Sequence, residues 1–237
     1  MTGVTHGKPG RTKKLFLACA LSLALSASAF AADNGFYVGL KFLDSIQSTG
    51  SVSRSGDVVN AFDVSNYSQN TVGGGVYVGY DFYTLNQVPL RAELEYAIRT
   101  NSTTSWDLKD GGNAADLKGT WGLQTLFLNA YWDFHNSTAF TPYVGAGVGM
   151  GFLRSKYEIE IPGVGSESTT EMKTVFAWNA GAGVSYAFTD NISADLAYRF
   201  VGLGYSENEK TIDGFGKQKV GMAPYANEFS LGLRYTF

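Results

Sequence analysis

Large apolar residues alternate with small or polar ones in eight segments of this chain. In the last segment, apolar or aromatic residues occupy every odd position from Phe229 to Phe237. Successive side chains of a β-strand point to opposite faces, so each segment has one apolar face and one polar face. The pattern predicts strands at residues 36–43, 71–83, 88–99, 120–135, 141–156, 174–188, 192–202 and 225–237.

The connections between these segments alternate in length. Short ones fall at 84–87, 135–140 and 189–191, whereas long ones, rich in Ser, Thr, Asn and Gly, fall at 44–70, 100–119, 157–173 and 203–224. Short periplasmic turns opposite long extracellular loops are typical of outer-membrane barrels. We therefore expect an all-β fold: one eight-stranded antiparallel transmembrane β-barrel with short periplasmic turns and four long extracellular loops.

Alternation alone does not say which face of the barrel points inwards, because a soluble lipocalin-like barrel has the same period. The lumen of an eight-stranded barrel is just wide enough for side chains to fill it. About five large apolar residues from each strand would not fit there, whereas the glycine-rich polar set would. The apolar face is therefore expected to point outwards, and an apolar belt of that size is stable only in lipid.

The first 31 residues have the pattern of a secretory signal peptide. Lys8, Arg11, Lys13 and Lys14 precede a short apolar run, and Ala31 closes a small-x-small cleavage motif. We expect cleavage near Ala31, leaving a barrel domain at 32–237 that contains no cysteine. Its 14 remaining Lys and Arg against 21 Asp and Glu give a net charge of about −7, which argues against nucleic acid as a partner.

Several short runs carry a family resemblance. They are Gly35-Phe36-Tyr37-Val38-Gly39, Arg91-Ala92-Glu93-Leu94-Glu95-Tyr96, Asn129-Ala130-Tyr131-Trp132-Asp133-Phe134, Thr141-Pro142-Tyr143-Val144-Gly145-Ala146-Gly147 and the terminal Tyr235-Thr236-Phe237. With them the chain resembles the small outer-membrane β-barrels of the opacity-protein and OmpA transmembrane-domain type. The resemblance implies a place in the cell outer membrane, among lipid and lipopolysaccharide, and we expect a monomer. It also implies that Tyr235 and Phe237 form the signal read by the barrel-assembly machinery.

Charged residues gather on the face expected to line the lumen. They are Lys41, Asp81, Arg91, Glu93, Glu95, Arg99, Asp133, Asp195, Arg199, Glu228 and Arg234. Ionisable groups inside a membrane protein need partners, and the near balance of signs favours pairing over ion selectivity. We interpret the set as a structural network that fills the lumen; an ion path or gate is the alternative.

The chain offers little for catalysis. Glu93 and Glu95 share a face at a spacing seen in glycosidases, but the lumen is too narrow to admit a sugar chain. His6 lies in the signal and His135 at a periplasmic turn, so no histidine is expected near the outer leaflet, where the lipid-modifying enzymes of small barrels need one. No catalytic, cofactor-binding or metal residue is predicted.

The long loops are the largest chemically varied surface. Phe62, Tyr67 and Trp106 are candidate contacts in them, because aromatic side chains often dominate binding energy. The sequence favours a non-enzymatic surface protein whose loops contact a host or cell-surface ligand and whose barrel supports the envelope. A small or gated porin-like channel is the alternative, and an outer-membrane lipid-modifying enzyme is a weaker one.

Overall fold

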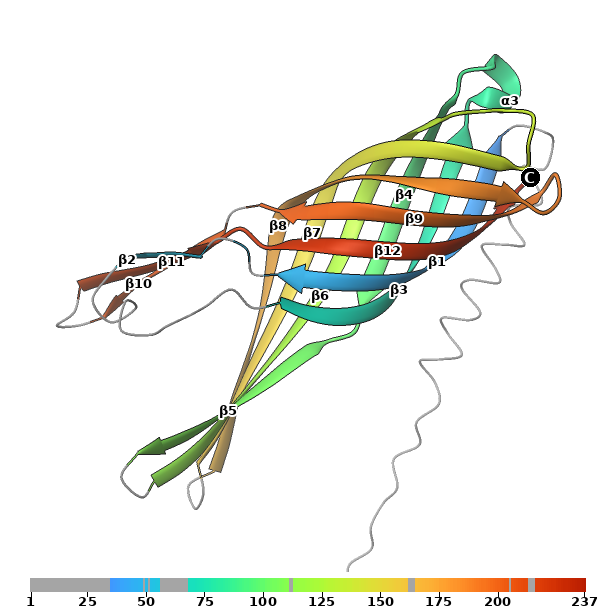
Figure 1. Ribbon diagram of the computed structural model, residues 1–237. Helices are drawn as coiled ribbons and strands as arrows, with labels where there is room; N and C mark the ends of the chain where they lie inside the picture. The colour runs from blue at the N-terminus through green and yellow to red at the C-terminus, as the bar shows by residue number, and fades with distance from the viewer. Residues whose placement is uncertain are drawn as a thin grey trace, which may run out of the picture.

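The chain folds into a closed barrel with extracellular strands at one end (Figure 1). The computed structural model describes residues 35–48, 50, 52–55, 68–110, 113–161, 165–204, 206–212 and 216–237. The barrel strands are β1 (Phe36–Ser48), β3 (Ser68–Asp81), β4 (Leu90–Arg99), β6 (Asn113–Asp133), β7 (Phe140–Ile161), β8 (Gly165–Ala187), β9 (Ile192–Leu203) and β12 (Tyr225–Thr236). Each pairs antiparallel with the next, and β12 pairs with β1, so the predicted eight-stranded barrel is confirmed.

The apolar face of the barrel points outwards, as the volume argument predicts. Leu40, Leu128 and Leu231 are 62%, 59% and 58% exposed, and together with the other large apolar residues of their faces they form the lipid-facing belt. On the alternate positions, Tyr37 and Glu95 are almost fully buried inside the barrel. With no water among the lipid chains, every main-chain polar group in the wall needs a partner, and closure provides one on both sides of each strand.

Strands β6, β7 and β8 extend beyond their predicted extracellular ends. β6 begins at Asn113 instead of 120, β7 runs to Ile161 instead of 156, and β8 begins at Gly165 instead of 174. The prediction of open loops at 100–119 and 157–173 is therefore wrong for most of these residues. The antiparallel ladders that start in the barrel continue above its rim, because main-chain pairing does not require apolar side chains.

The extracellular region contains four further strands. β5 (Ser102–Asp110) pairs with the upper part of β6, and β2 (Val52–Ser55), β10 (Ser206–Ile212) and β11 (Gly216–Met222) form a separate three-stranded sheet. The predicted loop at 203–224 is thus largely a β-hairpin. Part of the predicted loop at 44–70 is also strand, since β1 runs to Ser48 and β3 begins at Ser68.

The periplasmic end carries short turns, the chain terminus and a single helical turn, α3 (Tyr83–Asn86). His135 lies at the predicted periplasmic turn. Its ring is exposed and stacks on Tyr83 with ring centroids 3.8 Å apart, so it connects two turns. At the C-terminus, N–H of Phe237 donates to the carbonyl of Phe36 at 3.0 Å. Among the described residues, no helix has the length and apolar character needed to span a membrane.

Candidate functional site: an ion-paired lumen and extracellular strands

Ten of the eleven charged residues expected in the lumen take part in ion pairs there. The two-residue period of the strands explains the placement. On β4, for example, Arg91, Glu93, Glu95 and Arg99 all point inwards and are at most 6% exposed. Neighbouring strands supply the opposite charges, so the closed ring brings together residues that are far apart in the sequence.

Two carboxylates in the lumen each join two cations. Lys41 Nζ forms an ion pair with Glu95 at 2.6 Å, and Nη1 of Arg199 donates a hydrogen bond to Oε2 of Glu95 at 3.0 Å. Glu228 accepts hydrogen bonds from Nε of Arg199 at 2.8 Å and from Nε of Arg99 at 2.6 Å. The result is an unbroken chain of ion pairs, Lys41–Glu95–Arg199–Glu228–Arg99, that links β1, β4, β9 and β12 across the lumen.

Neutral side chains complete the coordination of these carboxylates. Ser45 Oγ donates to Glu228 at 2.8 Å, and Asn129 Nδ2 donates to Glu95 at 3.4 Å. Arg99 Nη1 donates to Thr125 Oγ1 at 3.1 Å. Buried charges are stable only when hydrogen bonds as well as opposite charges replace water, and both carboxylates meet that requirement.

A second cluster lies nearer the periplasmic end. Arg91 donates two hydrogen bonds to Asp133, from Nε to Oδ2 at 2.6 Å and from Nη2 to Oδ1 at 2.9 Å. Glu93 lies 3.5 Å from the same guanidinium and accepts a 3.0 Å hydrogen bond from the Tyr37 hydroxyl. The guanidinium carbon of Arg91 also lies over tyrosine rings, 5.0 Å from the centroid of Tyr131 and 4.9 Å from that of Tyr143. The cation is thus held by charge and by aromatic faces.

Arg234 and Asp195 form a looser pair beside this cluster. Their nearest charged atoms are 3.8 Å apart, and Arg234 is held mainly by the hydroxyls of Ser193 and Ser185, at 3.0 and 2.8 Å. Asp81 does not join any cluster, which corrects the prediction for this residue. It lies at the end of β3 and accepts the N–H of Tyr83 at 2.9 Å.

An apolar cluster fills the outer end of the lumen, and the sequence pattern missed it. Phe127 and Val201 are fully buried there, and the cluster also includes Leu123, Val175, Ala177, Leu203 and Ala226. The Phe127 ring centroid lies 5.5 Å from the guanidinium carbon of Arg199, so the cluster packs directly on the ion-pair chain. Apolar residues at inward positions in the outer parts of the strands were the sequence signal that could have predicted this cluster.

Tyrosine rings occupy the space left by inward glycines. Tyr37 lies opposite Gly79 and Tyr77 opposite Gly39 in the pairing of β1 with β3, and each ring covers the glycine of the other strand. A Cβ at either glycine would overlap the ring. The alternation of glycine with aromatic residues on inward positions was visible in the sequence, but only the register shows which ring meets which glycine.

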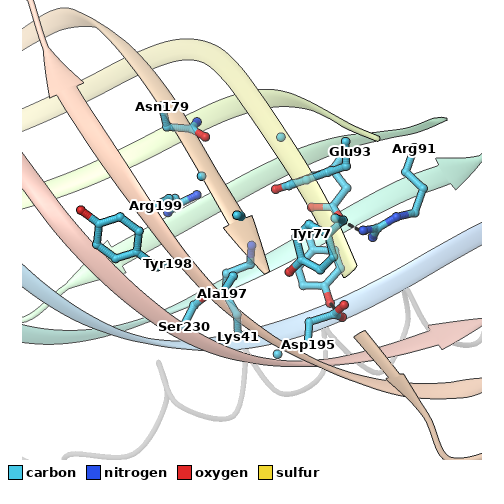
Figure 2. A pocket seen from close by; sticks show the side chains of 16 residues that line it. Lys41, Tyr77, Arg91, Glu93, Asn179, Asp195, Ala197, Tyr198, Arg199 and Ser230 are labelled. Carbon is cyan, nitrogen blue, oxygen red and sulfur yellow. Dashed lines mark hydrogen bonds and ion pairs between the residues drawn. The ribbon is translucent and has the colours of Figure 1, made fainter. Parts of the chain in front are cut away.

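The space that remains inside the barrel is small. A polar cavity of about 40 Å³ is lined by residues of both ion-pair clusters, among them Lys41, Glu93, Asp195 and Arg199 (Figure 2). A cavity of this size holds only a few water molecules. The lumen therefore holds paired charges around a small cavity instead of a ligand-sized chamber.

The geometry gives the two neighbouring glutamates structural partners. Glu93 is engaged by Tyr37 and Arg91, and Glu95 by Lys41 and Arg199, so each carboxylate is already held by a cation and a hydrogen bond. Among the described residues, no group of three or more His, Cys, Asp or Glu side chains is arranged to hold a metal ion.

The candidate loop contacts lie at the extracellular end. Trp106 is on β5, where its Cα pairs with that of Leu117 on β6. Phe62 and Tyr67 lie outside the described residues. The structure therefore places one of the three on a paired strand instead of in an open loop.

Comparison with known proteins agrees with this architecture. The family described as "Outer membrane protein beta-barrel domain" matches residues 17–237, which is nearly the whole chain. The chain belongs to this outer-membrane β-barrel family. Its place is therefore the outer membrane, with the apolar belt in lipid and the extended strands outside the cell.

Two relatives and one solved structure illustrate the similarity. Outer membrane protein PagN of Salmonella typhimurium is 33% identical over 95% of this chain and 100% of its own length. Protein RC1281 of Rickettsia conorii, named as a proposed adhesin, is 29% identical over 72% of this chain and 70% of its own length. The crystal structure of Neisserial surface protein A covers 86% of this chain and 97% of its own, with 20% identity and a TM-score of 0.44.

Proposed function

We propose that this protein is a non-enzymatic adhesin, in which a closed barrel presents extracellular strands to a ligand on a host or neighbouring cell. The observation that carries the proposal is the length of the strands. β7 and β8 contain 22 and 23 residues, whereas about 9–11 residues suffice for a strand to cross the outer membrane. Roughly half of each strand is therefore available to contact another surface.

The lumen supports the same proposal. Ion pairs and the apolar cluster occupy it, and its polar cavity is only about 40 Å³. A barrel filled in this way is a rigid scaffold, and rigid scaffolds commonly carry recognition on the segments that project from them. The name of the rickettsial relative, a proposed adhesin, agrees with this role.

The arrangement of the side chains also favours a protein without enzymatic activity. The two adjacent glutamates are held in ion pairs, and His135 lies at the periplasmic end, far from the outer leaflet. An outer-membrane enzyme that modifies lipids would need an activated nucleophile or base close to that leaflet.

Trimming the extracellular strands in register tests the proposal. Pairing of Lys156 with Thr170 allows residues 157–169 to be replaced by a two-residue Asn-Gly turn, and pairing of Thr104 with Gly119 allows the same for 105–118. Cells that express equal amounts of full-length or trimmed protein are then compared for attachment to cultured host cells. We expect attachment to be lost while the barrel still folds, because the ladders within the membrane are unchanged.

The control changes residues at the opposite end of the barrel. Replacing Ser137 and Thr138 in the periplasmic turn by glycine alters no extracellular residue, so attachment should remain. Full attachment by cells carrying both deletions would contradict the proposal that the extended strands β5 to β8 form the contact surface, and would leave the sheet of β2, β10 and β11 as the remaining extracellular surface.

A further inference from the structure

The outward face of β6, β7 and β8 changes from apolar to basic over three register rows. From the membrane outwards the rows are Leu126–Met150–Phe176, Gln124–Phe152–Thr174 and Gly122–Arg154–Met172. The first row belongs to the lipid-facing belt, since Met150 and Phe176 are 45% and 59% exposed. The second row mixes an aromatic ring with two polar side chains. Such a row marks the boundary between acyl chains and headgroups, where aromatic residues prefer to lie.

Two cations lie immediately above that boundary. Arg154 is exposed, and Lys156, two residues further along β7, is on the same face and partly exposed. Residues two apart on a strand are about 7 Å apart. Among the outward side chains that the structure describes on the barrel strands, the only other charge is Asp44, on β1. Because β1 and β7 are four strands apart in the ring of eight, Asp44 lies on the opposite side of the barrel.

The residues paired with the two cations on the neighbouring strands are uncharged. Arg154 lies between Gly122 and Met172, and Lys156 lies between Thr120 and Thr170. The nearby Glu171 pairs with Ser155, so it belongs to the opposite face of the sheet. One row further out, the Cα atoms of Glu158 and Lys118 are paired across β7 and β6.

We propose that Arg154 and Lys156 form a binding site for a phosphate group of lipopolysaccharide in the outer leaflet. The site is at the height where the headgroups of that leaflet begin, and its charge is opposite to theirs. A guanidinium can donate two parallel hydrogen bonds to a phosphate, and an ammonium adds a point charge beside it. Lys156 also makes an interaction within the chain, so Arg154 carries the larger part of the binding. Such a site requires only that the protein lies in the outer membrane, whether or not it is an adhesin.

Binding of lipopolysaccharide to the purified full-length barrel in detergent tests the site. The probes are lipopolysaccharide with its lipid A phosphates, the same material after enzymatic removal of those phosphates, and soluble inorganic polyphosphate. The variants are R154Q, the double variant R154Q/K156Q, and K173Q as a matched control. Lys173 pairs with Leu153 and so belongs to the opposite face of the same ribbon at a similar height. Retention of the heat-modifiable gel shift shows that each variant is folded.

We expect the intact lipid to bind about tenfold more weakly to the double variant than to wild type, with R154Q between them, because a hydrogen bond to a charged group contributes roughly that factor. K173Q should bind as wild type, and dephosphorylated lipid should bind wild type as weakly as intact lipid binds the double variant. Equal binding of intact and dephosphorylated lipid, or equal loss in K173Q, would overturn the site. Polyphosphate binding as tight as that of the lipid would show that the surface recognises soluble anions, and would overturn the assignment to a membrane lipid.

Discussion

Arg99 and Glu228 are 129 residues apart in the chain, yet Nε of Arg99 lies 2.6 Å from Oε1 of Glu228 and both side chains are completely shielded from solvent. The pair joins β4 to β12 across the lumen. Replacing Arg99 by Gln leaves part of the charge of Glu228 without compensation, and loss of one partner of a buried pair typically costs about 3–5 kcal/mol. We expect a large fall in the free energy of unfolding, measured by urea titration in lipid vesicles.

The double variant R99Q/E228Q provides the control for that experiment. Removing both charges restores balance at this pair, so the double variant should be less destabilised than the sum of the two single variants. Arg199 would still keep Glu95 as a partner. Wild-type stability in R99Q would mean that these side chains reach water, and would favour the channel hypothesis.

A second prediction concerns the pairs Tyr37–Gly79 and Tyr77–Gly39, in which each ring covers a glycine of the neighbouring strand. Changing Gly79 to Ala introduces a methyl group against the Tyr37 ring, and overpacking of this kind costs about 1–3 kcal/mol. Gly74, on the outward face of the same strand, is the matched control, because its nearest neighbour to an added Cβ is the carbonyl oxygen of Lys41 at 3.5 Å. Unfolding titrations should show a loss of stability for G79A that exceeds that for G74A. Equal losses of stability in G79A and G74A would mean that the loss does not arise from contact with the Tyr37 ring.

The filled lumen predicts poor conductance. Purified protein in planar bilayers should give no channels, or rare and small ones, because ion pairs and the cluster around Phe127 occupy the space that ions would need. Detergent without protein is the control for spurious steps. A steady and large conductance step that recurs between preparations would refute the closed lumen and support the channel hypothesis.

The C-terminal residue offers a test of assembly. Phe237 follows β12 at the periplasmic end, where its ring lies 5.2 Å from that of Tyr235 on the outside of the wall. Deleting Phe237 should lower the amount of protein in the outer membrane and leave protein in the periplasm, as fractionation and immunoblotting would measure. Thr236, whose side chain belongs to the inward face, is the control position, and T236S should assemble normally. An unchanged yield without Phe237 would contradict its role as the assembly signal.

The extracellular aromatic residues give a last prediction, which depends on the adhesin proposal. Single changes of Phe62, Tyr67 or Trp106 to Ala should reduce attachment to host cells with little effect on the folding of the barrel, since interface energy is usually concentrated in a few large side chains. Variants of Tyr96, an aromatic residue of the lipid-facing belt that is 40% exposed, serve as controls. Attachment measured at equal surface expression should fall for at least one loop variant. Full attachment by all three would remove these residues from the binding surface.

The sequence predicted the strands within the membrane more accurately than the segments outside it. In β9 and β12, for instance, the observed bounds of Ile192–Leu203 and Tyr225–Thr236 differ from the predicted ones by a single residue at one end. Lipid imposes a strict requirement on such segments, because the outward residues need to be apolar and the inward ones small or polar. Above the rim, water accepts almost any side chain, so the outer part of β8 has no comparable pattern and its polar composition predicts a loop instead of a strand.

The alternation of residues, taken with the small volume of an eight-stranded lumen, determined the number of barrel strands, the outward direction of the apolar face and ten of the eleven charges expected in the lumen. Pairing in a strand ladder depends on register and closure, which the local pattern does not contain. Only the tertiary structure decided that Glu228 binds Arg99 and Arg199, that Asp81 instead accepts the N–H of Tyr83, and that Phe127 packs on the ion-pair chain. The reason is physical: side-chain direction follows from the two-residue period of a strand, whereas partners across a lumen are set by how the strands of a closed ring are staggered.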